Sequence, residues 1–310
     1  MSPLSLTTES EEVMAPTLRP RRSALYLPGN NARALEKGKT LPADVLILDL
    51  EDAVGPDAKE DSRAKVCDAI SSGAYRTHEI VVRVNGSGTE WHDDDLAAVA
   101  SSAAHGVLVP KVEKGEQVQA LAAVLDTLGA PGSLQLWVMI ETPGAFLRAE
   151  EIASASDRLA ALVVGTNDLV NDLHGLHVPG RAPVVPALSL AVLGARAAGK
   201  AILDGVFNDI TDEGGFRAEA QQGREMGFDG KTLIHPSQIA PANDLAVLVA
   251  RPNAHGLVHD RREEVLLLLL RGKLRPLQVQ QVRLRLLHVQ FLLRGAWRFT
   301  FRHLRLHPVV

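Results

Sequence analysis

The sequence predicts an α/β chain folded as a (β/α)8 barrel, and three features of its pattern carry that prediction. Short apolar runs rich in β-branched residues recur eight times, at a mean interval of about 30 residues, which suits one strand with its crossover helix. Several runs are continuously apolar, as expected for parallel strands covered on both faces. Helix-like segments separate the runs. An open doubly wound sheet is the alternative, although it more often carries a glycine-rich loop after its first strand.

The apolar runs define the expected strands in chain order. They are residues 23–27, 44–50, 79–84, 106–110, 134–140, 159–164, 200–206 and 230–236. Between them, residues 57–73 begin with acidic side chains, repeat apolar residues at helical spacing and close on a glycine. Residues 114–129 have a similar pattern, and residues 212–228 form a third expected helix despite their glycines. Eight such units fit a closed barrel with helices outside.

The domain organisation follows from composition and charge. We expect a flexible N-terminal arm at residues 1–21, the barrel catalytic domain at 22–244, and an atypical basic segment at 245–310. Residues 251–310 hold 12 Lys and Arg against 3 Asp and Glu, a balance of +9 within a net charge of −4. This break in sign indicates a tail of different origin or purpose.

The same totals restrict the compartment and the class of protein. Cys67 is the single cysteine, so a disulfide framework is excluded and a reducing, cytoplasmic setting is expected. The N-terminus has no apolar core of the signal-peptide kind. The longest apolar run, Val265 to Leu270, is too short to cross a bilayer.

Polar residues end most of the expected strands. In a (β/α)8 barrel these positions lie at the C-terminal mouth, where active sites of this fold are found. The set comprises Asp49, Glu51, Asp52, Arg83, Asn85, Lys111, Glu141, Asn167, Asp168, Asp204 and His235.

Glu141 and Asp168 are the sharpest pair in this set. They follow adjacent strands, each just past the apolar run. Two oxygen donors with open remaining positions suit Mg²⁺, which keeps waters and takes substrate oxygens as ligands. The plainer interpretation is that either acid caps the next helix or pairs with a neighbouring arginine. That interpretation weakens when both acids hold matching barrel positions.

The two cations expected at the mouth, Arg83 and Lys111, can each pair with a protein carboxylate or with the substrate. Arg83 lies inside an apolar strand, where a buried guanidinium needs an anionic partner. The partner is Glu51 or a substrate carboxylate held bidentately. Lys111 has the same ambiguity. His235, before Pro236, is more typical of a satisfied structural histidine than of a catalyst.

Seven motifs taken together resemble the citrate lyase β-subunit-like family, a branch of the HpcH/HpaI aldolase superfamily that includes malyl-CoA and citramalyl-CoA lyases. They run in family order through residues 22–244. The motifs are RSALYLPGNNAR (22–33), LDLEDAVGPDAKEDSR (48–63), VVRVNGSGT (81–89), VPKVE (109–113), VMIETPGA (138–145), VVGTNDL (163–169) and GFDGKTLIHPSQI (227–239).

The resemblance implies a trimeric or hexameric (β/α)8 barrel with Mg²⁺ held by Glu141 and Asp168, so that Glu141 also meets the substrate through the metal. It implies that Arg83 is catalytic and contacts the carbonyl and carboxylate groups of the substrate. Family members make or break a carbon–carbon bond between a 2-oxo acid and an acyl-CoA enolate. Arg22 and Lys39 are then candidate contacts for the CoA phosphates.

The chain departs from the family after residue 244. Family members continue to an Asp-Gly motif whose aspartate serves in acid/base catalysis, but this sequence has no aspartate after Asp260. The loss of the motif and the change of charge suggest translation in a shifted reading frame from near Asn243–Leu245. The alternative is that residues 265–301 form an amphipathic basic helix for a membrane surface or nucleic acid.

The leading hypothesis is therefore an Mg²⁺-dependent lyase that cleaves a short 3-hydroxyacyl-CoA such as citramalyl-, malyl- or citryl-CoA. We expect its partners to be the CoA thioester, a 2-oxo acid and further copies of the chain, with neither nucleic acid nor membrane. The alternatives are a CoA-independent 2-oxo-acid aldolase and a non-catalytic barrel that binds Mg²⁺ and an oxo acid.

Overall fold

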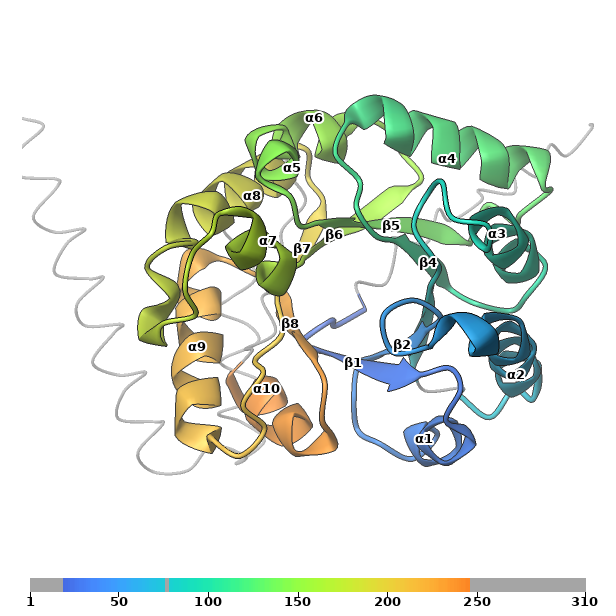
Figure 1. Ribbon diagram of the computed structural model, residues 1–310, viewed down its shortest axis with the longest axis horizontal. Coiled ribbons are helices and arrows are strands. Elements are labelled where there is room, and N and C mark those ends of the chain that lie inside the picture. Colours follow the sequence, from blue (N-terminus) through green and yellow to red (C-terminus); the bar gives the residue numbers. More distant parts are fainter. Residues whose placement is uncertain (1–18, 76–77, 246–310) are drawn as a thin grey trace, which may run out of the picture. The chain divides into compact units, whose positions relative to one another are not determined.

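Eight parallel strands form a closed barrel in the computed structural model, which describes residues 19–75 and 78–245 (Figure 1). Neighbours in the barrel follow chain order, and the first strand closes it by pairing with the last. Each apolar run overlaps one strand, so the prediction of a (β/α)8 barrel is confirmed. The strands are β1 (Ser23–Pro28), β2 (Val45–Asp49), β3 (Glu79–Arg83), β4 (Gly106–Val109), β5 (Gln135–Ile140), β6 (Leu159–Val164), β7 (Ala201–Asp204) and β8 (Gly230–Leu233).

Helices alternate with the strands and surround the barrel (Figure 1). The three helices expected from the sequence are present as α2 (Lys59–Ser71), α4 (Gly115–Thr127) and α9 (Glu213–Met226), the last running through its glycines. The other α-helices are α1 (Ala32–Gly38), α3 (His92–Ala100), α5 (Pro143–Leu147), α6 (Ala149–Ser154), α7 (Thr166–Asp172), α8 (Val185–Ala197) and α10 (Ile239–Leu245). Short 3₁₀ turns are η1 (Pro56–Ala58), η2 (Pro179–Arg181) and η3 (Pro236–Gln238).

The two predicted terminal segments fall mostly outside the described residues. The arm is described only from residue 19, and the basic segment only at residue 245. The shifted-frame hypothesis and its amphipathic-helix alternative therefore stay predictions. Across the described ranges, the helices are all too short or too polar to cross a membrane.

Strand side chains divide the core into two layers, because successive residues of a strand point to opposite faces. One layer fills the barrel, and the other lies between the strands and the helices. The inner layer comprises Ala24, Val45, Ile47, Val81, Leu108, Trp137, Met139, Ala161, Val163 and Leu203. On β2, β3 and β5, the next inward position after the last of these residues therefore reaches the mouth.

The amino-terminal end of the barrel is closed by a charged side chain lying over an aromatic one. The Arg21 guanidinium carbon lies 4.6 Å from the ring centroid of the fully buried Trp137, a favourable cation–π arrangement. Its nitrogens also donate to Glu79, at 2.7 and 2.8 Å, and to Gln135. These contacts separate the apolar interior from water at the end opposite to the mouth.

Asp204 does not face the mouth, which makes that part of the strand-end expectation wrong. Leu203 points into the barrel, so Asp204 points outward, against α9. There it is 1% exposed and accepts from Arg181 Nη1, at 2.7 and 2.9 Å, and from Lys231 Nζ at 3.2 Å. Glu219 of α9 completes this buried cluster by accepting from Lys231 at 2.8 Å. The cluster ties η2, β7, β8 and α9 together.

Asp204→Ala should destabilise the fold by about 3–5 kcal/mol, because it leaves Arg181 and Lys231 buried with one carboxylate between them. Urea denaturation of both proteins measures the difference. Glu225→Ala on the exposed face of α9 is the matched control and should change stability by less than about 0.5 kcal/mol. Equal stability of the Asp204 variant and the control would contradict a stabilising role for the cluster.

Candidate active site

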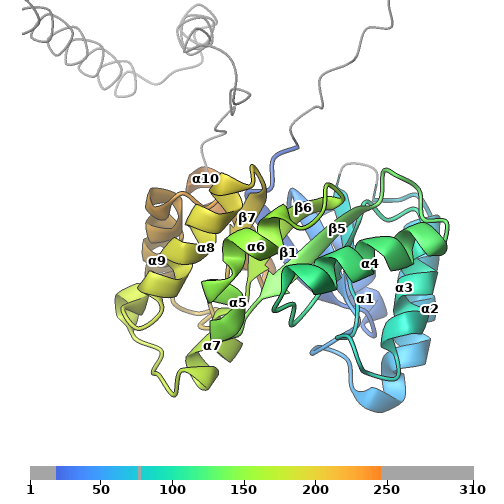
Figure 2. The same ribbon diagram turned by 90° about the horizontal axis from the view of Figure 1, so that it is seen from above.

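The inward side chains at the carboxyl ends of three strands form the centre of the site. Asp49 and Arg83 end β2 and β3 two residues after the inner-layer Ile47 and Val81, and Glu141 lies two residues after Met139. Asp168 joins them from the first turn of α7, directly after β6. In Figure 2, α5 and α7 lie at the same end of the barrel. The expectation that these residues share one mouth is therefore confirmed for this set.

The guanidinium of Arg83 is held on two edges by carboxylates. Asp49 accepts from Nε at 2.7 Å and from Nη2 at 2.6 Å, a bidentate pair. Nη1 lies 2.9 Å from Glu51 and 3.1 Å from Asp52, and the group stacks 4.8 Å from the Tyr26 ring centroid. Glu51 is one of the two partners expected from the sequence, but Asp49, which was not expected, makes the closer contacts. Asp49 fixes the orientation of the group, so Nη1 is the part turned toward the other mouth acids.

Glu51 is held in place through its backbone as well as its side chain. Its N–H donates to Asp49 Oδ1 at 2.9 Å, and its carbonyl accepts from Lys59 Nζ at 2.7 Å. Burial raises the pKa of the Glu51 carboxyl to about 7 although Arg83 lowers it, and the neighbouring Asp52 adds to the rise. A carboxyl with such a pKa can exchange a proton near neutral pH.

Glu141 is a buried carboxylate in a space that only a glycine leaves open. It is 5% exposed, and its Oε1 accepts from the Lys111 N–H at 2.8 Å. A Cβ built on Gly165 would lie 2.4 Å from the Glu141 Cβ and 2.5 Å from Oε2, far inside contact distance. Burial raises the pKa of Glu141 to about 7, and the charge of Asp168 raises it further, against the Lys111 hydrogen bond.

The oxygens of Glu141 and Asp168 fit a hard divalent cation. Within residues 19–75 and 78–245, Glu141 Oε2 and both Asp168 oxygens accept no hydrogen bond, and Asp168 meets Lys111 Nζ only at 3.9 Å. Those ranges contain no group of three or more metal-ligating side chains. A cation held here would keep two protein oxygens and complete its shell with water or substrate, as Mg²⁺ does.

The mouth as a whole carries an excess of negative charge. Five carboxylates, Asp49, Glu51, Asp52, Glu141 and Asp168, lie with three cations, Arg83, Lys111 and Lys59, a formal balance of −2. Burial is the main cause of the pKa values of about 7 at Glu51 and Glu141, and the neighbouring carboxylates add to the rise. A divalent cation would offset this excess of negative charge.

Arg22 and Lys39 do not join these residues. Arg22 precedes β1 and donates to Asp44 from its backbone N–H, Nε and Nη2 at 2.7–2.9 Å. Lys39 follows the last turn of α1 and donates to Glu36 at 2.5 Å. Both lie at the amino-terminal end of the strands, opposite to the mouth, because they precede β1 and β2. Their assignment to CoA phosphates stays a prediction that this placement does not favour.

Two other polar residues at strand ends have structural partners. His235 caps η3, where its Nδ1 accepts from the Ser237 N–H at 3.2 Å, so the structural interpretation of this histidine is confirmed. Asn85 donates to the buried Asp95 of α3 from its backbone N–H at 3.0 Å and from Nδ2 at 2.6 Å. Among the described residues, neither side chain forms a hydrogen bond with Glu141.

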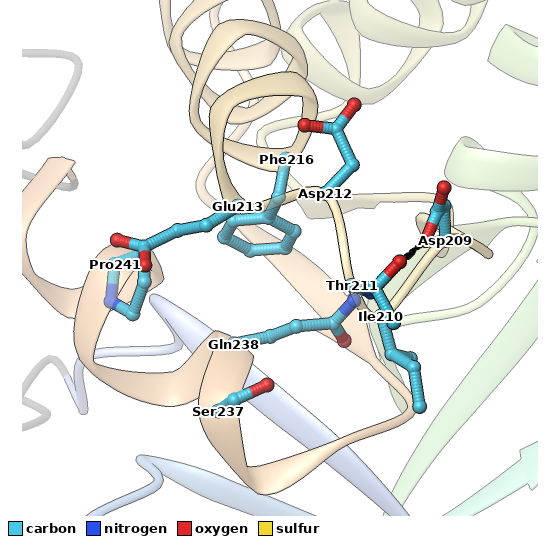
Figure 3. Close-up of a pocket in the computed structure, with 9 residues that line it drawn as sticks. All are labelled: Asp209, Ile210, Thr211, Asp212, Glu213, Phe216, Ser237, Gln238 and Pro241. Atoms are coloured by element: carbon cyan, nitrogen blue, oxygen red, sulfur yellow. Dashed lines mark hydrogen bonds between the residues drawn. The ribbon is translucent and has the colours of Figure 1, made fainter.

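A separate pocket lies between the start of α9 and η3 (Figure 3). Three acids line it, but each has a local partner. Asp209 accepts from Thr211 at 2.6 Å, Asp212 caps α9 through the Gly215 N–H, and Glu213 accepts from Arg217. The pocket contains none of the predicted site residues, so we place the candidate active site at the mouth on the chemistry of its side chains.

The chain is similar to proteins of one family. The family model described as HpcH/HpaI aldolase/citrate lyase matches residues 22–236. The (3S)-malyl-CoA thioesterase of Cereibacter sphaeroides is 46% identical over 74% of this chain and 78% of its own length. The citrate lyase subunit beta of Escherichia coli is 36% identical over 79% and 81%.

A solved structure extends this likeness to three dimensions. The protein CitE of Mycobacterium tuberculosis, in complex with magnesium, acetoacetate and coenzyme A, is 31% identical and superposes with a TM-score of 0.61. The match covers 80% of this chain and 88% of that one. The resemblance inferred from the motifs is confirmed by these comparisons.

Glu141→Gln should stabilise the metal-free protein at pH 8 by about 1–3 kcal/mol. The folded state there keeps a buried carboxylate ionised although its pKa is about 7, above the ordinary 4.5. Because the folded pKa is the higher one, wild-type stability falls as pH rises from 4.5 to 7, and the cost is complete above pH 7. Glutamine avoids this cost and keeps an oxygen for the Lys111 N–H.

Urea denaturation with a chelator at pH 5 and pH 8 measures this effect. The stabilisation should shrink at pH 5, where the wild-type carboxyl is mostly protonated in the folded state. Glu116→Gln on the exposed face of α4 is the control and should match wild type at both values. If the variant is no more stable than wild type at pH 8, burial does not raise the pKa of the Glu141 carboxyl in the folded protein.

Proposed function

The chain belongs to the HpcH/HpaI aldolase/citrate lyase family, and on that premise we propose that it is a carbon–carbon lyase for a short 3-hydroxyacyl-CoA, with Mg²⁺ as cofactor. The observation that carries the proposal is the pair Glu141 and Asp168. Their free oxygens lie in the same mouth as the oriented guanidinium of Arg83. A metal pair beside a fixed cation suits a substrate that carries a carboxylate and a thioester carbonyl.

The relatives support this class of substrate. One is named for malyl-CoA, one is a citrate lyase subunit, and the solved CitE complex holds magnesium, an oxo acid and coenzyme A. Malyl-, citramalyl- and citryl-CoA share a hydroxyl and a carboxylate on the carbon next to the thioester's α-carbon. We favour malyl-CoA because the relative with 46% identity is named for it. The trimer or hexamer implied by the resemblance stays a prediction.

Mg²⁺ bound by Glu141 and Asp168 would supply a Lewis acid for the hydroxyl and carboxylate oxygens of the substrate. Side chains of the mouth supply the remaining contacts with the substrate. Arg83 turns Nη1 toward the mouth while Asp49 holds its other edge. Nη1 can therefore donate to the thioester oxygen, on which negative charge develops.

Cleavage moves one proton and one electron pair. The hydroxyl proton leaves, its oxygen becomes the carbonyl of the oxo acid, and the carbon–carbon bond pair passes to the thioester as an enolate. Protonation of that enolate gives the acyl-CoA. We assign the proton to Glu51, whose pKa of about 7 lets it accept and return a proton. Its backbone contacts with Asp49 and Lys59 hold it beside Arg83.

Hydrolysis of the same thioester is the second candidate, because the relative with 46% identity is named a thioesterase. The bound state would be similar, but water would attack the thioester carbonyl and coenzyme A would leave as a thiol. The products separate the two reactions. A lyase gives an acyl-CoA and an oxo acid, whereas hydrolysis gives free coenzyme A and the intact hydroxy acid.

Purified protein with Mg²⁺ and a panel of malyl-, citramalyl- and citryl-CoA should convert one member into acyl-CoA and oxo acid, as detected by mass spectrometry. Glu141→Ala should lower the rate by about a hundredfold or more, because it removes a metal ligand. Free coenzyme A with intact hydroxy acid would replace the lyase with a thioesterase. Turnover of a hydroxy acid without coenzyme A would indicate an aldolase, and binding without turnover a non-catalytic barrel.

Glu51→Gln should lower kcat by about 10²–10⁴-fold, the usual contribution of a general base, while Mg²⁺ and oxo-acid binding stay at wild-type values. Steady-state kinetics and calorimetry measure the two effects. The matched control is Asp52→Asn, which also removes a carboxylate from Arg83 Nη1 but whose side chain is 73% exposed. A similar loss in both variants would mean that Glu51 acts only through the charge of Arg83.

A further inference from the structure

Lys111 has an unusual backbone for a residue with a long side chain. It follows Pro110 at the end of β4, and its φ of 56° lies in the left-handed region that favours glycine. A non-glycine residue there is strained, and such strain persists where the surroundings impose it, often at functional sites. The cause of the strain must therefore be sought in what Lys111 contacts.

The contacts of this turn lie on β5 and just beyond it. The Lys111 N–H donates to Glu141 Oε1 at 2.8 Å, and the next N–H, of Val112, donates to the Met139 carbonyl at 3.2 Å. The left-handed turn thus directs one backbone donor at a candidate metal ligand and returns the chain to the strand beside it. The φ of Lys111 sets the angle between these two N–H groups, so an ordinary φ would misplace one of the two contacts.

The ammonium of Lys111 is the second feature. Its side chain is 57% exposed, and its closest acidic partner in the described chain is Asp168 Oδ2 at 3.9 Å, beyond hydrogen-bond distance. Arg83 differs, because Nε, Nη1 and Nη2 all meet carboxylates within 3.1 Å. Among the described residues, Lys111 is therefore the one of these two cations whose side-chain donors meet no carboxylate within hydrogen-bond distance, whereas Arg83 Nη1 reaches a ligand only by releasing the exposed Asp52.

The ammonium of Lys111 lies beside the proposed metal pair, 3.9 Å from Asp168 Oδ2. A substrate group that reaches this ammonium therefore lies next to the metal site, whereas the phosphates of coenzyme A are separated from the thioester by the length of the pantetheine arm.

We propose that Lys111 binds the carboxylate of the oxo-acid half of the substrate with its ammonium, while its left-handed backbone orients Glu141. The inference rests on the proposed function for the identity of the ligand. An anionic acid that approaches this carboxylate-rich mouth needs a cation whose donors are not already taken by carboxylates, and Lys111 supplies it. Lys111 then positions both the metal ligand Glu141, through its N–H, and the substrate carboxylate, through its ammonium.

The test compares a charged ligand with its uncharged ester. Calorimetry with saturating Mg²⁺ should show that Lys111→Met binds pyruvate about 10- to 100-fold more weakly than wild type, the range for a lost charge-assisted contact. Methyl pyruvate should bind both proteins equally. Mg²⁺ alone should bind the variant at least as tightly as wild type, since a repelling cation is gone.

Lys37→Met is the matched control, because Lys37 is exposed in the last turn of α1, at the other end of the barrel. It should bind pyruvate as wild type does. Equal pyruvate affinity of Lys111→Met and wild type would overturn the proposal, as would an equal loss for pyruvate and methyl pyruvate. Wild-type protein that binds no pyruvate would overturn it too. Failure of the proposed lyase function would appear separately, as a protein that binds pyruvate but forms no product from the CoA thioesters.

The backbone half of the proposal is tested by a second pair of variants. Lys111→Gly and Lys111→Ala both remove the ammonium, but glycine adopts a φ of 56° without strain. The glycine variant should therefore melt about 2–6 °C above the alanine variant. It should also bind Mg²⁺ more tightly, because it holds the turn, and so the direction of the N–H that orients Glu141, without the strain of an alanine Cβ at this φ. Equal melting and equal Mg²⁺ affinity would show that the left-handed turn does not orient Glu141.

Discussion

The buried pair between Arg83 and Asp49 is the interaction on which the arrangement of the mouth depends. A guanidinium that is 7% exposed at the end of an apolar strand would be costly without a partner, and the bidentate carboxylate of the neighbouring strand supplies it. The pair also links β2 to β3, and its Asp49 carboxylate accepts a hydrogen bond from the Glu51 N–H. The orientation of Arg83 and the position of Glu51 thus both depend on one contact.

Alternation along the strands explains which acids serve the mouth and which serve the fold. Asp49 and Glu141 continue the inward series of β2 and β5, so their carboxylates meet in the mouth. Asp204 occupies the other face of β7 and packs with Arg181 and Lys231 under α9. Two carboxylates at strand ends can look alike in sequence and differ in role because their positions differ by one residue.

The sequence was sufficient for the barrel because eight apolar runs with helical segments between them leave few other folds. It was also sufficient for Glu141, Asp168 and Arg83 as mouth residues, since they follow or end successive strands. It was not sufficient for Asp204, because a run such as residues 200–206 does not show which face is inward. Arg22 and Lys39 were assigned by resemblance alone, and their position before a strand would have placed them at the opposite end.

Other features of the site could not be predicted because they are properties of packing. Gly165 looks like an ordinary cap residue in sequence, yet the space of its missing Cβ is filled by Glu141. The left-handed φ of Lys111 has no signal in its residue type. Both constrain the same carboxylate, one by excluding atoms and one by donating a hydrogen bond. On the proposed function, the excess of carboxylates around it also favours one order of binding, with the divalent cation before the anionic acid, because without the cation these carboxylates repel the acid.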